Sequence, residues 1–375
     1  MTNLLQKTLR YVFNERARRN YKKHYQALLK HNNIPDEFCL NEKEWIAKWG
    51  CLGKLNTVEY RLFSHYVGYD IKIVPEVMCK KVIEPLLNPV LFRGCYADKN
   101  FFDKLFKPGV LPKTILRKIN GFYYDSIYDF IVLNSSFELY EILANNNIET
   151  IVIKPSVATS SGKGVKLFSV KNGQWQDLVS DDILTIEYLN TKYGNDFIIQ
   201  ECLEQADSIS YYNPTSVNTL RLTMYRSVKN DECHIPNARI RIGKNGSIVD
   251  NAHAGGALVG IKPDGSLCNT VVDQYGSITT IFNNIDFSKE HKIPNWGKII
   301  EFAKYVGKQI PHMRLLSLDI MIDKSGEPRL IEFNCSSYSV WAAQFTVGPA
   351  FGDLTDEIIE YCKNNLDKAQ KIIKL

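Results

Sequence analysis

Apolar residues repeat at different intervals along the chain, and the change of interval divides the sequence into a helical beginning and a mixed remainder. From residue 1 to about residue 88 the spacing is mostly helical. Asn41 followed by Glu44 predicts a capped helix start, and Pro75 predicts another. Four large residues follow the spacing of a core-facing stripe, so we assign a packing role to Trp45, Trp49, Leu62 and Phe63.

Beyond Asn88, short runs rich in β-branched and aromatic residues alternate with turn signals such as N-G, D-G and S-G. The runs expected as strands include TILRKI, TIVIKP, VKLFSV, FIIQECL, NTLRLTMYR, ARIRIG, ALVGIKP, LSLDIMID and PRLIEFN. Helices are expected at residues 98–106, 135–145, 295–310 and 355–369. This order of elements predicts an α+β protein with antiparallel hairpins behind a helical N-terminal region.

The stretch S-S-G-K-G-V, residues 160–165, is similar to a phosphate-binding loop but departs from the Walker A pattern. Gly164 follows Lys163 where that pattern needs Ser or Thr, and Val157 replaces its first glycine. The alternating VKLFSV after it predicts a loop between two strands. Small residues let backbone amides approach an anion, and Lys154 ends the preceding strand. A polar surface loop is the alternative, and the residues alone leave both open.

A second pattern with chemical meaning is the predicted hairpin LSLDIMIDKSGEPRLIEFN. If its turn is centred between Ser325 and Gly326, Asp319 faces Glu332 across the strand pair, and Asn334 shares their face. Opposed carboxylates repel unless a cation lies between them, and carboxylate and amide oxygens suit Mg²⁺. The alternatives are that one carboxylate faces solvent, or that a basic side chain such as Arg314 or Arg329 pairs with them.

Charge is distributed unevenly along the chain. Residues 1–30 hold eight Lys and Arg against one acidic residue, a net +7, which leaves −2 for the rest of a chain whose total is +5. This argues against a nucleic-acid partner for the body of the protein and makes residues 1–30 a candidate for docking on an acidic membrane or partner. The alternative is a solvated helix face, which is common.

Nine scattered cysteines contain no C-x-x-C pair, so we expect reduced thiols and neither a zinc nor a thioredoxin-like motif. No stretch has the pattern of a signal peptide or a membrane span. We therefore expect a cytoplasmic protein that is able to touch the inner face of the membrane through residues 1–30.

In combination, I-K-P, S-S-G-K-G-V, IIQECL and the pair L-D-I and I-E-F-N resemble the ATP-grasp superfamily. The sequence is more similar still to the sugar-transfer associated ATP-grasp family, through LNP, DKNFFDKLF, SVNTLRLTMYR, VDNAHAGG and QFTVGPAFGDLTDEI, over roughly residues 88–360. The resemblance implies the ATP-grasp fold, in which two α+β lobes clamp ATP. It implies a helical, basic region at 1–90, a first lobe with phosphate loop and hinge at 91–204, and a second lobe with the metal site at 205–375.

The resemblance also implies a nucleotide site. Lys99 and Lys154 would contact the phosphates, beneath a covering loop made of Ser160, Ser161, Gly162, Lys163 and Gly164. Gln200 and the backbone from Glu201 to Leu203 would bind adenine, and Asp207 would bind ribose, with Glu204 as its competitor.

Arg221 resembles the arginine that holds the transferring phosphoryl group, for which a planar and permanently charged fork is suited. Arg239 and Arg241, with Asn251 and His253, would line the acceptor side. The catalytic candidates are thus Arg221, Lys154, Asn251 and His253, and the metal ligands are Asp319, Glu332 and Asn334, with ATP and Mg²⁺ as cofactors.

The activity that the resemblance implies is ATP-dependent ligation of a carboxylate to an amine through an acyl phosphate, on a sugar-containing or cell-surface polysaccharide precursor. The absence of a G-x-S-x-G elbow agrees with chemistry that needs no protein nucleophile. Two other functions stay open at this point: phosphoryl transfer without ligation, and a non-catalytic nucleotide-binding scaffold.

Overall fold

The computed structural model describes residues 2–157, 162–336 and 338–370, and the chain divides by its contacts into two compact units. Unit 1 comprises Met1–Arg93, Ser208–Ile320 and Phe333–Leu375, and unit 2 comprises Gly94–Asp207 and Met321–Glu332. Each unit combines helices with strands of a seven-stranded sheet, which confirms the predicted α+β class. The three-part division at residues 90 and 204 stays a prediction; by contacts, the helical beginning groups with the C-terminal part.

The sheet of unit 2 has the strand order β3-β2-β1-β7-β4-β5-β6, with antiparallel neighbours. The strands are β1 (Thr114–Ile119), β2 (Phe122–Tyr124), β3 (Phe130–Ile131), β4 (Thr150–Pro155), β5 (Lys166–Lys171), β6 (Gln174–Asp177) and β7 (Phe197–Glu201). Helices α7 (Ser136–Ala144) and α8 (Ile186–Tyr193) bury Leu139 and Leu189 in one core with Ile153 and Phe197. Because β4 pairs with β5, residues 156–165 connect two antiparallel strands, as predicted.

The second sheet has the order β12-β11-β10-β9-β8-β15-β16. Its strands are β8 (Leu220–Arg226), β9 (Cys233–Ile242), β10 (Ala257–Ile261), β11 (Leu267–Val272), β12 (Ile278–Thr279), β15 (Leu315–Ile322) and β16 (Pro328–Asn334), and a separate pair joins β13 (Ile281–Phe282) to β14 (Ile285–Asp286). One face is apolar and packs on α10 (Trp296–Lys308), where Gly307 approaches Met224 so closely that a Cβ would lie 2.7 Å from its Cε. Alternation along the strands places Arg221, Arg239 and Asp319 on the opposite face.

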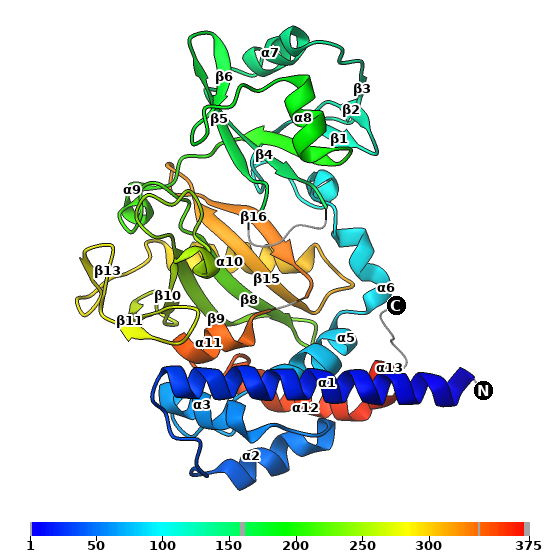
Figure 1. Ribbon diagram of the computed structural model, residues 1–375, viewed down its shortest axis with the longest axis vertical. Coiled ribbons are helices and arrows are strands. Elements are labelled where there is room, and N and C mark those ends of the chain that lie inside the picture. Colours follow the sequence, from blue (N-terminus) through cyan, green and yellow to red (C-terminus); the bar gives the residue numbers. More distant parts are fainter. Residues whose placement is uncertain (1, 158–161, 337, 371–375) are drawn as a thin grey trace. The chain divides into compact units, whose positions relative to one another are not determined.

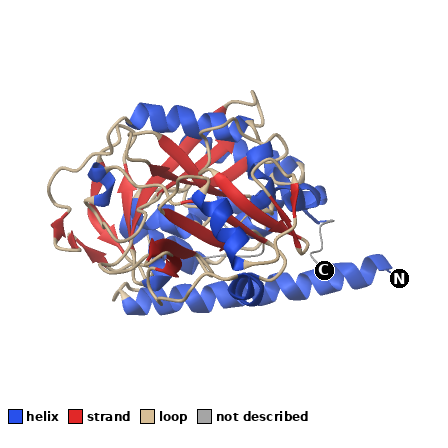
Figure 2. Cartoon of the chain, turned by 90° about the horizontal axis from the view of Figure 1, so that it is seen from above, coloured by secondary structure: helices blue, strands red, loops and turns tan. Residues whose placement is uncertain are grey.

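Short and long helices make up the rest of unit 1 and the connection to unit 2 (Figure 1). Before the first sheet these are α1 (Thr2–His31), α2 (Glu42–Trp49), η1 (Gly50–Leu52), α3 (Thr57–Val67), α4 (Glu76–Met78), the π-helical η2 (Cys79–Ile83), α5 (Glu84–Leu87), α6 (Val90–Arg93), η3 (Gly94–Tyr96) and η4 (Lys99–Lys104). The later ones are α9 (Asp207–Ser210), η5 (Ala252–Ala254), α11 (Val340–Thr346), η6 (Gly352–Leu354), α12 (Thr355–Asn364) and α13 (Leu366–Gln370). Helix α1 is uninterrupted in both ribbon views, Figure 1 and Figure 2.

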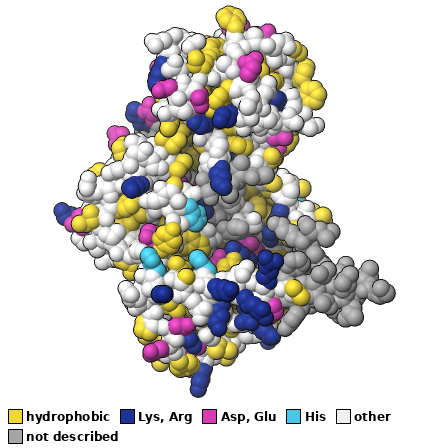
Figure 3. Space-filling view, in the orientation of Figure 1, with side chains coloured by type: hydrophobic (Ala, Val, Ile, Leu, Met, Phe, Trp, Pro, Cys, Tyr) yellow, Lys and Arg dark blue, Asp and Glu magenta, His cyan; other side chains and the backbone are white. Residues whose placement is uncertain are grey.

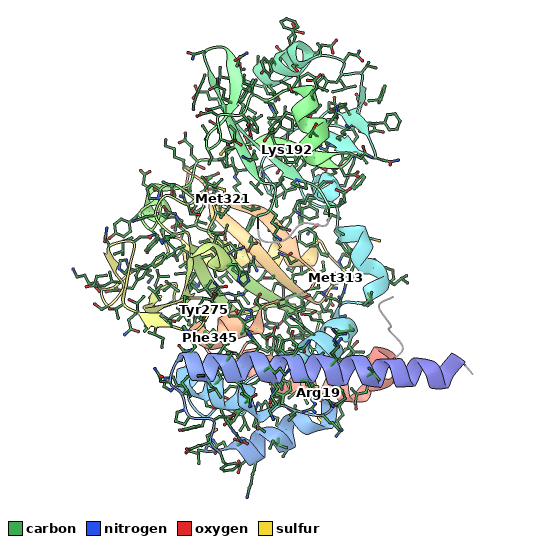
Figure 4. The ribbon with its side chains drawn as sticks, in the orientation of Figure 1. Arg19, Lys192, Tyr275, Met313, Met321 and Phe345 are labelled. Atoms are coloured by element: carbon green, nitrogen blue, oxygen red, sulfur yellow. The ribbon has the colours of Figure 1, made fainter. Side chains whose placement is uncertain are left out.

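The N-terminal helices share one hydrophobic core with the C-terminal segments. Trp45, Trp49, Leu62 and Phe63 are completely buried in it, which confirms their packing role. Phe345 of α11, labelled in Figure 4, lies with its ring centroid 5.1 Å from that of Phe63. The helical beginning is therefore packed as part of unit 1.

Three local predictions need correction. Asn41 precedes α2, but it has a left-handed backbone and its side chain donates to the Tyr69 carbonyl, so it makes no cap hydrogen bond. The helix expected over 355–369 is interrupted at Asn365 and forms α12 and α13. The one expected over 98–106 is the 3-10 helix η4, although Asp98 does cap it by accepting from the Asn100 amide.

The turn between β15 and β16 also differs from the prediction. The Asp323 amide donates to the Glu327 carbonyl at 2.9 Å, and the Gly326 amide donates to the Asp323 carbonyl at 2.8 Å. Gly326 has φ 82°, the left-handed conformation that ends a three-residue hairpin loop. The turn is therefore centred on Ser325, the predicted centre is wrong, and the direct opposition of Asp319 and Glu332 loses its support. The chain contains no helix, within its described part, of the length and apolar character that crossing a bilayer requires.

Asn88 ties the start of β15 to the segment after β16. Its fully buried amide group donates to the carbonyls of Leu315 and Cys335 at 2.6 and 2.9 Å and accepts from the amides of Arg314 and Leu315 at 3.0 Å each. No alternative donor or acceptor from water reaches a side chain buried in this way. Asn88 therefore anchors the hairpin that carries Asp319, Glu332 and Asn334.

We expect Asn88→Ala to lower the free energy of unfolding by about 2–3 kcal/mol, because several buried backbone groups lose their partner. Urea unfolding followed by tryptophan fluorescence measures this, with the exposed Asn20→Ala as the control. Equal midpoints for the two variants would show that Asn88 has no anchoring role.

Candidate functional site

Unit 2 brings together three residues that the sequence analysis singled out: Lys99, Lys154 and Glu332. The Lys99 Nζ lies 3.2 Å from Glu332 Oε1, and the Lys99 amide donates to the Ser156 carbonyl at 3.0 Å, which holds η4 against the end of β4. Burial lowers the pKa of Lys154 to about 8; Glu332 opposes this shift and Lys99 adds to it. Two cations thus lie close together with one carboxylate, an arrangement that can bind a polyphosphate.

The loop after β4 is described only in part, since Ser160 and Ser161 lie outside the described residues. Gly162 and Gly164 have φ values of 70° and 78°, which favour glycine. A Cβ on Gly164 would also lie 2.9 Å from Cγ of Pro155. The glycines are thus required by the backbone, whereas Lys163 is exposed and carries no comparable constraint.

The predicted adenine-binding strand is β7. Its Gln200 side chain is buried and donates to the Pro112 carbonyl and to Thr114 Oγ1, both at 3.3 Å. The Glu201 amide donates to the Lys113 carbonyl at 2.9 Å. Gln200 and the Glu201 amide therefore have partners within the protein, and recognition of a base by them, or by the backbone of Leu203, stays a prediction.

Two acids after β7 were candidates for the ribose. Glu204 is exposed and pairs with Lys324, whose Nζ lies 2.6 Å from its carboxylate. Asp207 is also exposed and begins α9. Because Lys324 already neutralises Glu204, the structure favours Asp207 for this role.

In unit 1, Arg221 and Asp319 face each other on neighbouring strands and form a two-pronged ion pair, with Arg221 Nη2 2.6 Å from Asp319 Oδ2. Arg241 lies 3.4 Å from the same carboxylate and 2.8 Å from Asp250. Although burial opposes it, Arg221 and Arg241 hold the pKa of Asp319 below its ordinary value. Asp250 also accepts from the Thr219 amide at 2.9 Å.

This cluster corrects the expectation about which basic residues pair with the hairpin acids. Arg314 lies 3.0 Å from Asp231 and Arg329 lies 2.7 Å from Asp323, so neither of them serves Asp319 or Glu332. Sequence reasoning missed Asp250, for which the only signal was its place in V-D-N-A-H-A-G-G.

Asn251 and His253 lie beside one another at η5. The Asn251 side chain accepts from the His253 amide at 3.1 Å, so it caps η5. His253 is exposed, and its ring Nδ1 shares a hydrogen bond with the Gln274 side chain. Asp250 joins this segment to the arginine cluster through Arg241. A catalytic role for Asn251 or His253 stays a prediction.

A family model, described as sugar-transfer associated ATP-grasp, matches residues 88–358. The chain belongs to the sugar-transfer associated ATP-grasp family. A comparison with curated proteins gives no significant match. The assignment to this family places the chain in the ATP-grasp superfamily and agrees with the fold class expected from the sequence.

Solved structures of ATP-grasp proteins are similar to this chain only distantly. The ATP-grasp ligase PsnB, complexed with the precursor peptide PsnA2 and AMPPNP, is 12% identical over 74% of this chain and 62% of its own, with a TM-score of 0.40. The D-cycloserine synthetase DcsG is 13% identical over 75% and 73%, with a TM-score of 0.41. Biotin carboxylase from Campylobacter jejuni is 10% identical over 72% and 46%, with a TM-score of 0.40. The chain thus spans less than two thirds of PsnB, and no residue role is taken from these structures.

The donor atoms of Asp319, Glu332 and Asn334 fit Mg²⁺ in chemistry, since all three offer oxygen from neighbouring strands β15 and β16. Charge balance, however, does not demand a metal, because Arg221 and Arg241 neutralise Asp319 and Lys99 neutralises Glu332. Among residues 2–157, 162–336 and 338–370, no cluster of three or more His, Cys, Asp or Glu side chains has the geometry to hold a metal. A metal here would rely on the Asn334 amide and on the phosphates of a nucleotide.

The lowered pKa of Lys154 makes nucleotide affinity depend on pH. The free protein loses the Lys154 charge as pH rises through about 8, whereas a bound polyphosphate favours the charged form and raises this pKa. Affinity for ATP should therefore be highest below pH 8 and fall by up to about tenfold per unit above it. Calorimetry with AMPPNP at pH 7, 8 and 9 measures this, and Lys154→Arg, which keeps its charge, should show a much flatter profile. Identical pH profiles for the two proteins would contradict the assignment.

Proposed function

We propose that the protein is an ATP-dependent carboxylate–amine ligase that releases ADP and works through an acyl phosphate. The observation that carries the proposal is the gathering of Lys99 and Lys154 at the end of β4, in a chain of an ATP-grasp family. Lysines at this place neutralise the charge of a polyphosphate, and Gly162 and Gly164 let the following backbone approach it.

The reaction has two steps. A carboxylate oxygen of the substrate attacks the γ-phosphorus of ATP, the bond to the bridging oxygen breaks, and ADP leaves. An amine then attacks the carbonyl carbon of the acyl phosphate, the carbon–oxygen bond breaks, and an amide, inorganic phosphate and a proton are released. Lys99 and Lys154 hold the phosphates, and Arg221 orients the transferring group with its fork.

Mg²⁺, when bound by Asp319, Glu332 and Asn334, would offset charge on the phosphates. Asp207 is the residue that we propose for the ribose. The acceptor side would be formed by Asn251 and His253, which lie together at η5. Because the family is named for sugar transfer, the proposed substrates are sugar-containing or cell-surface polysaccharide precursors, handled in the cytoplasm.

Phosphoryl transfer without ligation uses the same groups, so products distinguish the two reactions. The protein, ATP and Mg²⁺ are incubated with uronic acids and amino acids in the presence of amines. Ligation gives ADP, free phosphate and amide in equal amounts. A stable phosphorylated product without free phosphate supports a phosphotransferase, and binding of ATP without any turnover supports a scaffold.

We expect Glu332→Gln to reduce turnover at least about a hundredfold, since it removes the partner of Lys99 and one proposed ligand at the phosphates. The exposed Glu360→Gln is the matched control and should keep its rate. Circular dichroism checks that both variants fold. Full turnover in Glu332→Gln would overturn the proposed site.

A separate proposal concerns where the enzyme works. Helix α1 buries Tyr25, Leu28 and Leu29, while the opposite face exposes a stripe of cations at helical spacing that comprises Arg16, Arg19, Lys23 and Lys30. Lys and Arg side chains gather over this part of the molecule in Figure 3, and Arg19 is labelled in Figure 4. The helix contains one acid, Glu15, which pairs with Arg18 at 2.9 Å. We propose that this stripe docks on an anionic lipid surface.

Each cation near such a surface contributes about 1 kcal/mol. The protein should therefore sediment with vesicles containing phosphatidylserine at low salt, and release at high salt. Exchange of the four stripe residues for Glu should abolish sedimentation, whereas exchange of the exposed Lys289 and Lys292 should not. Equal binding of all three proteins, or binding only to an acidic protein partner, would contradict a lipid-docking role.

A further inference from the structure

Arg239 is a buried cation without an acidic partner. It is 1% exposed, in the middle of β9. Its Nη1 donates to the Asn237 side-chain oxygen at 3.1 Å and its Nη2 to the Tyr338 carbonyl at 3.5 Å, and both acceptors are neutral. Across the described part of the chain, no carboxylate lies within ion-pair distance of it. Burying a charge in this way is unfavourable unless something else neutralises it.

The two nearest acids are already engaged. Asp319 receives both prongs of Arg221 and a further contact from Arg241. Asp250 pairs with Arg241 and accepts from the Thr219 amide. The cluster therefore has three guanidinium groups against two carboxylates, an excess of one positive charge that falls on Arg239.

Strand register makes the imbalance sharper. Asp319 is opposite Arg221 on the neighbouring strand, and Arg221 is opposite Arg239 on the next, so one row across the sheet reads acid, base, base. Like charges directly opposed on neighbouring strands repel. Burial, together with Arg221 and Arg241, lowers the pKa of Arg239 to about 9, and Asp319 only partly opposes this shift. The protein thus keeps an arginine where its own residues disfavour the charge.

We infer that Arg239, with Arg221 and Arg241, forms a seat for an oxyanion carried by the substrate. The ligand supplies the missing negative charge, as a carboxylate or a phosphate ester does. The Arg221 and Arg241 side chains are each 15% exposed, so the cluster reaches the surface through them while Arg239 lies beneath. The inference rests on the proposed function and deepens it, because it requires a substrate with a permanent anion besides the carboxylate that is activated.

The test uses the whole protein without nucleotide, so its outcome does not depend on turnover. Thermal unfolding is followed in inorganic phosphate and in acetate, with ionic strength held constant by sodium chloride. In the natural protein both midpoint and affinity should report oxyanion binding. In Arg239→Met the affinity should fall at least about tenfold, because a charge-assisted hydrogen bond is lost. The ligand-free variant should be as stable as the natural protein or more stable, because a buried unpaired charge has been removed.

Arg226 provides a matched control in the same sheet. It is also buried, but it has partners, since its Nη1 lies 3.6 Å from Asp231 and its Nη2 donates to the Pro311 carbonyl. Arg226→Met should lower the unfolding midpoint and leave the oxyanion effect unchanged. If Arg239→Met fails to fold, Arg239→Lys keeps the charge and should retain oxyanion binding at reduced affinity.

The outcomes separate the sources of the anion. An effect of phosphate that Arg239→Met abolishes indicates a phosphate ester, and the same pattern with acetate indicates a carboxylate. Stabilisation that persists unchanged in Arg239→Met arises at another place, such as the lysines of unit 2, and overturns the inference. So does a loss of ligand-free stability in Arg239→Met as large as that in Arg226→Met, since Arg239 would then be structural. Failure of the ligase proposal would appear instead as absent turnover with oxyanion binding intact.

Discussion

The ion pair between Arg221 and Asp319 is the constraint around which the second sheet is arranged. Both groups lie on its polar face, and each would be unfavourable there alone. The pairing makes it possible for one face of β8, β9 and β15 to carry charge while the other packs on α10. It also commits Asp319 to arginine in the absence of ligand, so any metal or phosphate that binds this carboxylate must compete with Arg221.

The same reasoning links the two groups of site residues through charge. Unit 2 holds two lysines against Glu332, and unit 1 holds three arginines against two aspartates. In each case the protein provides more positive than negative charge, which suits binding partners rich in oxyanions. A reaction between ATP and an acid requires this kind of environment, because its transition state spreads negative charge over phosphoryl oxygens.

Much of the fold was accessible from the sequence because local signals and burial agree. The alternating runs became strands, and Trp45, Trp49, Leu62 and Phe63 became core, since period and side-chain type both favour this. The turn at Ser325 was misplaced by half a residue because a glycine after a polar pair fits both two- and three-residue loops. Asn41 failed as a cap because its side chain found a distant partner, the Tyr69 carbonyl, which local patterns do not show.

The site was accessible in part for the same reason. Lys99 and Lys154 were found through motifs and do lie with Glu332, but ion pairs across strands depend on register and were not predictable. The most direct test of the central claim is the fate of the substrate carboxylate oxygen. Uronic and amino acids labelled with ¹⁸O in the carboxylate are incubated with the protein, ATP, Mg²⁺ and amines, and phosphate is analysed by mass. The account predicts one labelled oxygen in the released phosphate for each amide formed; ATP turnover that leaves the label in the acid would contradict it.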